Sequence, residues 1–208
     1  MNNLESSLAE FFKVAIRSQT YLNLVYLFLA FPLGLFYFIF LIIGFFLGFG
    51  LLIVWVGALI LPMVFVAEWS WAGFERQLAI RLLHEDISPL KRNAPNGMKT
   101  WDWIKSNMAN PATWKSPAYL LAKFPLGVLT FTVLVTLITI TLTFLGAPVI
   151  YRFFPMEVEH FGISAILIDT PWKAILSVFI GVALLFPTLH IANGLAWISG
   201  RFAKVMLS

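Results

Sequence analysis

Few side chains inside the apolar stretches of this sequence could carry chemistry. His190 and Asn193 are three residues apart, so on a helix they lie on one face. Glu68 ends another apolar stretch. A histidine near a carboxylate can change its charge near neutral pH, and ionisable residues in membrane spans are candidates for function. We therefore predict a polar cluster of these three residues near the cytoplasmic ends of the helices, either pH-responsive or purely structural.

A second polar pattern is a row of threonines with spacings of four, three and four residues, which places them on one helical face. The row consists of Thr132, Thr136, Thr139 and Thr143. A threonine hydroxyl can bond to the backbone of its own helix or to a neighbouring helix. The row is thus interpreted as a seam where two helices pack, with a polar pathway through the membrane as the alternative.

The remaining reactive groups predict no catalytic, cofactor or metal site. The chain has no cysteine, which excludes disulfides and thiol chemistry. Glu157, Glu159 and His160 form only a weak cation-binding pattern, and an ordinary solvated turn explains them more simply. A phosphate-binding glycine loop, a nucleophile elbow and a catalytic pair of carboxylates are all lacking. The sequence therefore does not predict an enzyme.

Composition defines the class of protein that must position these groups. Of the 208 residues, 60% are hydrophobic and only 12% are charged. Uncharged runs such as Ser18 to Ala67 far exceed the roughly 20 apolar residues that a spanning helix needs. We predict an all-α polytopic membrane protein, because helices satisfy the backbone within lipid. The net charge of +4 comes from basic residues beside the spans and does not indicate nucleic-acid binding.

The predicted architecture is a single membrane domain, residues 1–208, of four transmembrane helices arranged as two parallel repeated hairpins. The repeats are residues 20–83 and 113–208, with spans at about 21–45, 51–71, 119–145 and 171–198. Residues 1–19 are expected to form an amphipathic interfacial helix, and residues 84–112 a cytoplasmic linker with a second interfacial helix. Proline at the first helical position predicts helix starts at Pro111 and Pro171, whereas Pro117 is expected to interrupt the lead-in to the third span.

The two hairpins are related by an internal repeat. The sequence Phe31–Gly34 returns as Phe124–Gly127, an offset of 93, and flanking residues match in the same register. The second helix of each hairpin matches more weakly, at an offset of 125. Within the repeats we predict kinks or hinges at the prolines and close helix packing at the glycines. These residues are Pro32, Pro62, Pro125, Pro187, Gly34 and Gly127.

The distribution of basic residues predicts the orientation in the membrane. The segment between the second and third spans holds eight of them, from Arg76 to Lys123, whereas the loop of residues 146–170 holds only Arg152. The positive-inside rule then places both termini and the central segment in the cytoplasm, in the inner membrane. Basic residues at this level also predict contact with anionic lipid headgroups.

The sequence resembles the putative sensor family, four-helix membrane domains of bacteria and archaea that are often fused to histidine kinases. The resemblance rests on Thr20 to Gly34, on Asn110 to Trp114 leading into Phe124–Gly127, and on the arginine-bearing exits after spans two and four. It implies a membrane-embedded sensing or regulatory module. No output domain follows Ser208, so signalling through a separate protein partner is expected, with a homodimer as one arrangement. The alternatives are an accessory subunit of a larger membrane complex and, less favoured, a small transporter.

The orientation can be tested with single cysteines, because the natural chain has none. An impermeant thiol reagent added to intact cells is expected to label a cysteine at Glu159 and not one at Asn96, since only the former lies outside. Lysed cells, in which both positions react, provide the control. Labelling at Asn96 alone in intact cells would reverse the topology.

Overall fold

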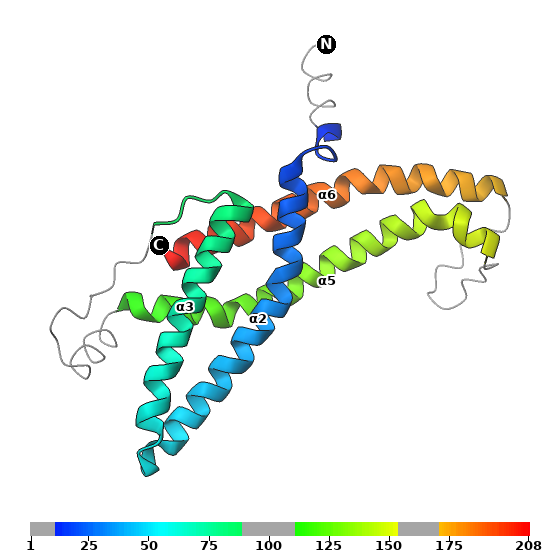
Figure 1. Cartoon of the computed structure of the whole chain (residues 1–208). Coiled ribbons are helices and arrows are strands. Elements are labelled where there is room, and N and C mark those ends of the chain that lie inside the picture. Colours follow the sequence, from blue (N-terminus) through cyan, green and yellow to red (C-terminus); the bar gives the residue numbers. More distant parts are fainter. Residues whose placement is uncertain (1–10, 89–110, 154–170) are drawn as a thin grey trace. The chain divides into compact units, whose positions relative to one another are not determined.

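A computed structural model describes residues 11–88, 111–153 and 171–208 (Figure 1). Four long helices account for most of these residues: α2 (Ser18–Gly50), α3 (Gly57–Leu83), α5 (Pro111–Phe153) and α6 (Pro171–Leu207). A short 3₁₀ helix, η1 (Leu51–Val54), joins α2 to α3. The described ranges contain no strand, and all four long helices are long and apolar enough to cross a membrane. The chain is therefore an all-α polytopic membrane protein, as predicted.

Two helix starts agree with the sequence prediction, whereas α3 begins at Gly57 rather than near residue 51, and the helices run further than predicted. Both α5 and α6 start at a proline, Pro111 and Pro171. However, α2 has 33 residues, a length of about 50 Å, compared with a hydrocarbon core of about 30 Å. The prediction that Pro117 interrupts the helix is wrong, because α5 continues through it. A proline removes one backbone hydrogen bond from a helix, and packing against neighbouring helices lets the helix continue through it.

Two residues with positive φ lie in the first hairpin, one at the turn between α2 and α3 and the other at the end of α3. Trp55 has φ 65° and its N–H bonds back to the carbonyl of Leu52, which reverses the chain before α3. His84 has φ 55° and caps the C-terminus of α3 through the carbonyl of Ala79. Residues 1–10 and 89–110 lie outside the described ranges, and most of the two predicted interfacial helices lies with them.

The chain forms two compact units, which we describe separately. The smaller unit comprises residues 1–20 and 132–193, and the larger one residues 21–131 and 194–208. In the smaller unit α5 and α6 form an antiparallel pair. A methyl group placed on Gly181 would lie 2.8 Å from the backbone nitrogen of Leu145, and the hydroxyls of Thr141 and Thr188 are 3.1 Å apart.

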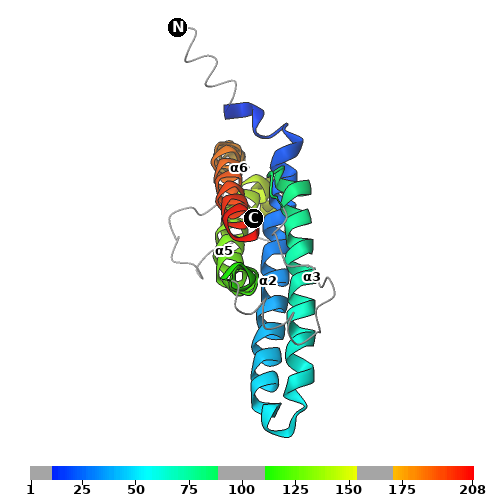
Figure 2. The same cartoon turned by 90° about the vertical axis from the view of Figure 1, so that its left-hand side faces the viewer.

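The larger unit contains α2 and α3 side by side, crossed by the beginning of α5 and the end of α6 (Figure 2). The helices α2 and α5 meet at two glycines. A methyl group on Gly34 would lie 2.8 Å from the carbonyl oxygen of Lys123, and one on Gly127 would lie 2.7 Å from that of Ala30. Each glycine thus receives the equivalent backbone of the other repeat, since Ala30 and Lys123 are themselves 93 residues apart. The crossing has a local two-fold symmetry.

Burial follows the same symmetry. Four pairs separated by 93 residues are almost completely buried on both helices: Thr20 and Thr113, Tyr26 and Tyr119, Leu27 and Leu120, and Leu41 and Leu134. In α3 and α6 the buried faces align at an offset of 124, which pairs Ala72 with Ala196 and Ala79 with Ala203. The offset of 125, at which Pro62 matches Pro187, would instead pair buried Ala72 with Trp197, which is 60% exposed. One residue turns a helix face by about 100°, so burial gives the structural register.

Substituting the crossing glycines tests this packing. Gly34→Ala and Gly127→Ala are each expected to destabilise the protein by about 1–3 kcal/mol, because the new methyl group meets rigid backbone. The matched control is Gly73→Ala, since nothing lies within 4 Å of the position where its methyl group would stand. Helix propensity makes this control neutral or stabilising by up to about 1 kcal/mol. Unfolding of the purified protein in mixed micelles measures all three, and equal effects would contradict the close crossing.

Candidate functional site

The strongest candidate site lies beside the glycine crossing and is built by three helices of the larger unit. Helix α5 supplies Tyr119 and Lys123, four residues apart and therefore on one face. Helix α2 supplies Tyr26, the repeat equivalent of Tyr119, and α3 supplies Glu75. All four side chains are buried, and that of Glu75 is 0% exposed.

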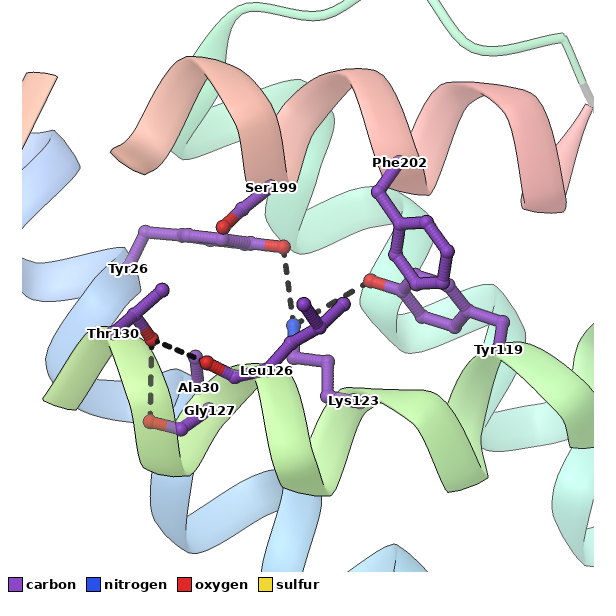
Figure 3. A pocket seen from close by; sticks show the side chains of 9 residues that line it. All are labelled: Tyr26, Ala30, Tyr119, Lys123, Leu126, Gly127, Thr130, Ser199 and Phe202. Atoms are coloured by element: carbon purple, nitrogen blue, oxygen red, sulfur yellow. Dashed lines mark hydrogen bonds between the residues drawn. The ribbon is translucent and has the colours of Figure 1, made fainter. Parts of the chain in front are cut away.

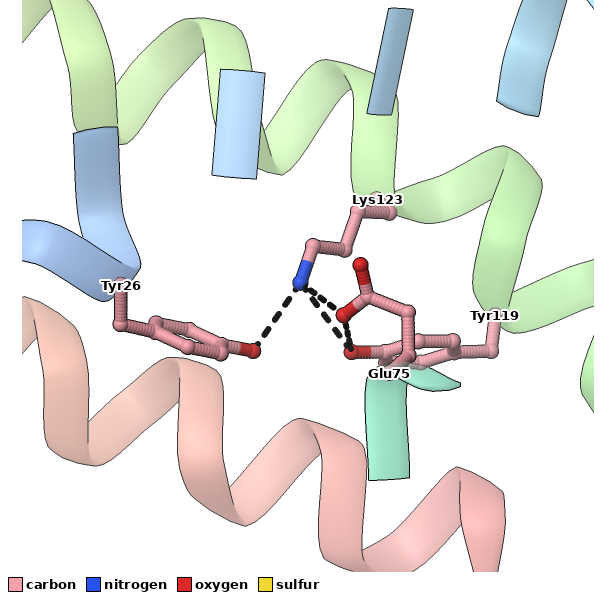
Figure 4. Close-up of polar contacts among 4 residues, drawn as sticks. All are labelled: Tyr26, Glu75, Tyr119 and Lys123. Atoms are coloured by element: carbon pink, nitrogen blue, oxygen red, sulfur yellow. Dashed lines mark hydrogen bonds and ion pairs between the residues drawn. The ribbon is translucent and has the colours of Figure 1, made fainter. Parts of the chain in front are cut away.

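The four side chains converge on one ammonium group (Figure 4). The Nζ of Lys123 donates a hydrogen bond to the Tyr26 hydroxyl at 3.0 Å and forms an ion pair with Oε2 of Glu75. The Tyr119 hydroxyl donates to the same Oε2 at 3.4 Å. Lys123 therefore links α5 to α2 and α3, and Glu75 is held by two groups of α5.

The surroundings of the ammonium explain how a charge is tolerated here. Removing an ion from water costs several kcal/mol, which an opposite charge and well-placed hydrogen bonds can offset. The Lys123 Nζ lies 4.5 Å from the ring centroid of Tyr26 and 5.7 Å from that of Tyr119, so two aromatic faces add to the stabilisation. Ionisable groups in membrane helices are rare and usually mark functional positions.

The second carboxylate oxygen of Glu75 takes no part in the ion pair. Its Oε1 and the hydroxyl of Tyr37 are both buried, and neither has a hydrogen-bond partner among the described residues. Buried polar atoms without a partner are uncommon in folded proteins.

A small cavity adjoins the ion pair on the side of α6 (Figure 3). Its volume is about 20 Å³, and its lining includes Tyr26, Lys123, Thr130, Ser199 and Phe202. That volume suffices for roughly one water-sized group. The hydroxyl of Thr130 already donates to the carbonyl of Leu126 at 2.9 Å.

The site also contacts the C-terminal part of α6. There α6 packs against the end of α3, beyond the ion pair. The ring of Phe202 stacks on Tyr119 with centroids 5.4 Å apart. Two residues further along α6, the Lys204 ammonium is 3.7 Å from the Glu85 carboxylate, just after the C-terminus of α3. Gly200 lets these segments approach, because a methyl group there would lie 3.1 Å from Glu85. The ion pair therefore lies next to the packed ends of α3 and α6.

The predicted cluster of Glu68, His190 and Asn193 is divided between the two units. His190 is exposed, stacks on the ring of Phe11 at 4.7 Å and approaches its carbonyl oxygen at 3.3 Å. The amide of Asn193 donates to the Thr20 hydroxyl at 3.2 Å. Both contacts lie in the smaller unit and are structural in character. Glu68 is completely buried on α3, in the larger unit, and its grouping with the other two stays a prediction.

Within the described residues, the threonine row lies on an exposed face of α5 rather than in a packed seam. Thr132, Thr136, Thr139 and Thr143 are all exposed, and Thr143 bonds to the carbonyl of Thr139 at 2.8 Å on its own helix. The buried threonines of α5 are instead Thr113, Thr130 and Thr141. The spacing of the threonines places them on one face of the helix but does not determine whether that face is buried or exposed.

The predicted prolines and glycines occupy different surfaces. Pro32 and Pro125 are exposed, whereas Gly34 and Gly127 are buried at the crossing. Pro187 is exposed and Pro62 half-buried, and all four prolines lie inside continuous helices. Whether they act as hinges stays a prediction. The acidic residues and histidine of the loop at 157–160 lie outside the described residues.

Sequence reasoning missed the pair of Lys123 and Glu75. Lys123 was counted only as one of the basic residues that set the orientation, and Glu75 was assigned no role. Two signals were available: the lysine follows Tyr119 by one helical turn, and Tyr119 repeats Tyr26. Glu75 also lies two turns after Glu68, on the same face of α3.

Comparison with known proteins gives one match. A family model described as "Putative sensor" matches residues 26–207, which is most of the chain and includes every residue of the candidate site. No curated protein and no solved structure matches.

Removing one partner of the ion pair tests its contribution to stability. Lys123→Met is expected to cost about 3–5 kcal/mol, because Glu75 is left as an uncompensated buried charge. The double variant Lys123→Met, Glu75→Leu is expected to recover most of that loss. The control is Lys204→Met, whose partly exposed pair with Glu85 is worth at most about 1 kcal/mol. Unfolding in mixed micelles gives the comparison, and equal losses for both lysines would contradict a buried pair.

Proposed function

Because this chain belongs to the putative sensor family, we propose that it is a sensing module embedded in the membrane that passes its signal to a separate partner protein. The family and the four membrane-crossing helices define a sensor-type membrane module. The observation that carries the finer proposal is the buried ion pair of Lys123 and Glu75, which joins three helices and contacts the end of the fourth. The family description also favours a non-enzymatic role.

The signal travels through the ion pair to the helix ends. Lys123 holds Glu75 on α3, and its neighbour Tyr119 holds Phe202 on α6. A change in the membrane that alters the crossing of α2 and α5 shifts Lys123, because Gly34 packs on the carbonyl of that residue. The ends of α3 and α6 then move together, because they pack closely at Gly200, where a methyl group would lie 3.2 Å from the side chain of Leu83.

The helix ends present a basic surface that suits both lipid and a partner. Arg81 and Arg201 are exposed, while Arg76 ties the following segment back by donating to the carbonyl of Ile87 at 3.0 Å. Basic residues beside a membrane attract anionic headgroups by about 1 kcal/mol each. In this proposal the ends and both termini face the cytoplasm from the inner membrane, where a partner protein reads their arrangement. A homodimer is one form that this partner could take.

Crosslinking between the helix ends tests the proposal. Glu85→Cys and Lys204→Cys introduce the only thiols in the chain. In vesicles of neutral phosphatidylcholine and in vesicles containing phosphatidylglycerol, a short bis-maleimide is expected to join them at different rates. The same pair in the Lys123→Met, Glu75→Leu background is expected to lose that difference, because the connection to the crossing is removed.

The matched control places the cysteines in the Gly73→Ala background, which should behave like the parent. An accessory subunit with fixed helix ends predicts one crosslinking rate in every membrane and in every background. That outcome would reject the sensing proposal in favour of the structural role.

A further inference from the structure

The cavity beside Lys123 is the symmetry counterpart of the ion pair. At an offset of 93, Lys123 on α5 corresponds to Ala30 on α2. At the offset of 124 that burial defines, Glu75 on α3 corresponds to Ser199 on α6. Both Ala30 and Ser199 line the cavity. One side of the local two-fold is therefore filled by a lysine and a glutamate, whereas the other side has two small residues and an unfilled space.

We propose that this cavity is a binding site for one uncharged oxygen atom, from water or from a carbonyl or hydroxyl group of a membrane lipid. The oxygen bridges the ion pair to Ser199 on α6. This inference deepens the sensing function proposed above and rests on it, because it names what occupies the site.

The groups around the cavity are arranged to donate hydrogen bonds to such an oxygen. Lys123 has three N–H groups; it directs one to Tyr26 at 3.0 Å, one to Glu75 and one, at the longer distance of 3.5 Å, to Tyr119. An oxygen in the cavity would replace the long contact with Tyr119 as acceptor of the third N–H. The Tyr26 hydroxyl accepts from Lys123, which leaves its own proton for donation, and Ser199, whose hydroxyl lies beside Tyr26 in Figure 3, also lines the cavity.

Charge and size restrict the occupant. Lys123 and Glu75 already balance each other, so an anion or cation would bring an unpaired charge into a buried site at a cost of several kcal/mol. A cavity of about 20 Å³ holds about one water-sized group. The apolar part of the lining, which includes Ala30, Leu126 and Phe202, excludes a larger polar molecule.

The bound oxygen would complete the connection between the charged helices and α6. Phe202 contacts Tyr119 through its ring alone, whereas a bridging oxygen adds a polar link to Ser199, one turn before Phe202. A bridging water contributes nearly as much enthalpy as a direct hydrogen bond. Occupancy of the cavity is thus a property that the membrane could change.

Nuclear magnetic resonance of lysine ammonium groups tests the site directly. The protein, labelled with ¹⁵N at lysine, is placed in nanodiscs of neutral phosphatidylcholine whose lipids carry protons. The Lys123 ammonium is expected to show a cross-peak to water if the oxygen is a water molecule, or to lipid glycerol protons if it belongs to a lipid. Either result supports the site, and a Lys123 ammonium without either cross-peak overturns it.

Filling the cavity provides the matched comparison. Ser199→Leu is expected to abolish the cross-peak while the Lys123 ammonium resonance persists, because the leucine occupies the cavity without touching the charges. Ala30→Val fills the same space from α2, should Ser199→Leu prevent folding. Ser70→Leu on the exposed face of α3 is the control and should retain the cross-peak. A cross-peak that survives both filling variants places its source elsewhere and contradicts the proposal.

These results are separable from the test of the proposed function. A dry cavity together with lipid-dependent crosslinking of the helix ends would remove this inference and leave the sensing role intact. A bound oxygen together with constant crosslinking would support the site and reject the signalling.

Discussion

A carboxylate buried in the middle of four apolar helices has to be neutralised where it lies. Glu75 meets this constraint through Lys123, and the neighbouring structure follows from the need to bring the two together. The lysine must reach α3 from α5 past α2, which is feasible because Gly34 and Gly127 allow α2 and α5 to approach at backbone distance. Tyr26 and Tyr119 then enclose the ammonium with hydroxyls and aromatic faces.

The ion pair is an asymmetric feature placed on a symmetric scaffold. The glycines, the tyrosines and the buried leucines of α2 and α5 repeat at one offset and support the same crossing from both sides. Lys123 has no counterpart, since Ala30 stands at the equivalent position. A duplicated scaffold of this kind can keep its packing while one half acquires charge, and the half without charge retains free volume next to the lysine.

The sequence was sufficient to predict the scaffold because its signals are local. Apolar runs predicted four helices, prolines marked the starts of α5 and α6, and the repeated Phe31–Gly34 sequence predicted the glycines at which the helices cross. The site was harder to predict because burial depends on contacts between helices that are distant in sequence. Lys123 has the same local sequence context as a topology-setting residue, and the exposed threonine row has the same spacing as a buried one.

The buried ion pair of Lys123 and Glu75 joins α5 to α3, and the rest of the account depends on it. The most direct measurement is the dipolar coupling between ¹⁵N at Lys123 Nζ and ¹³C at the Glu75 carboxylate, recorded by solid-state magnetic resonance on protein in lipid bilayers. A measurable nitrogen–carbon coupling is predicted, as expected for a salt bridge whose nitrogen–oxygen separation is within about 4 Å. The absence of a measurable coupling, with the helices still folded, would show that the two charges do not pair and would contradict the claim.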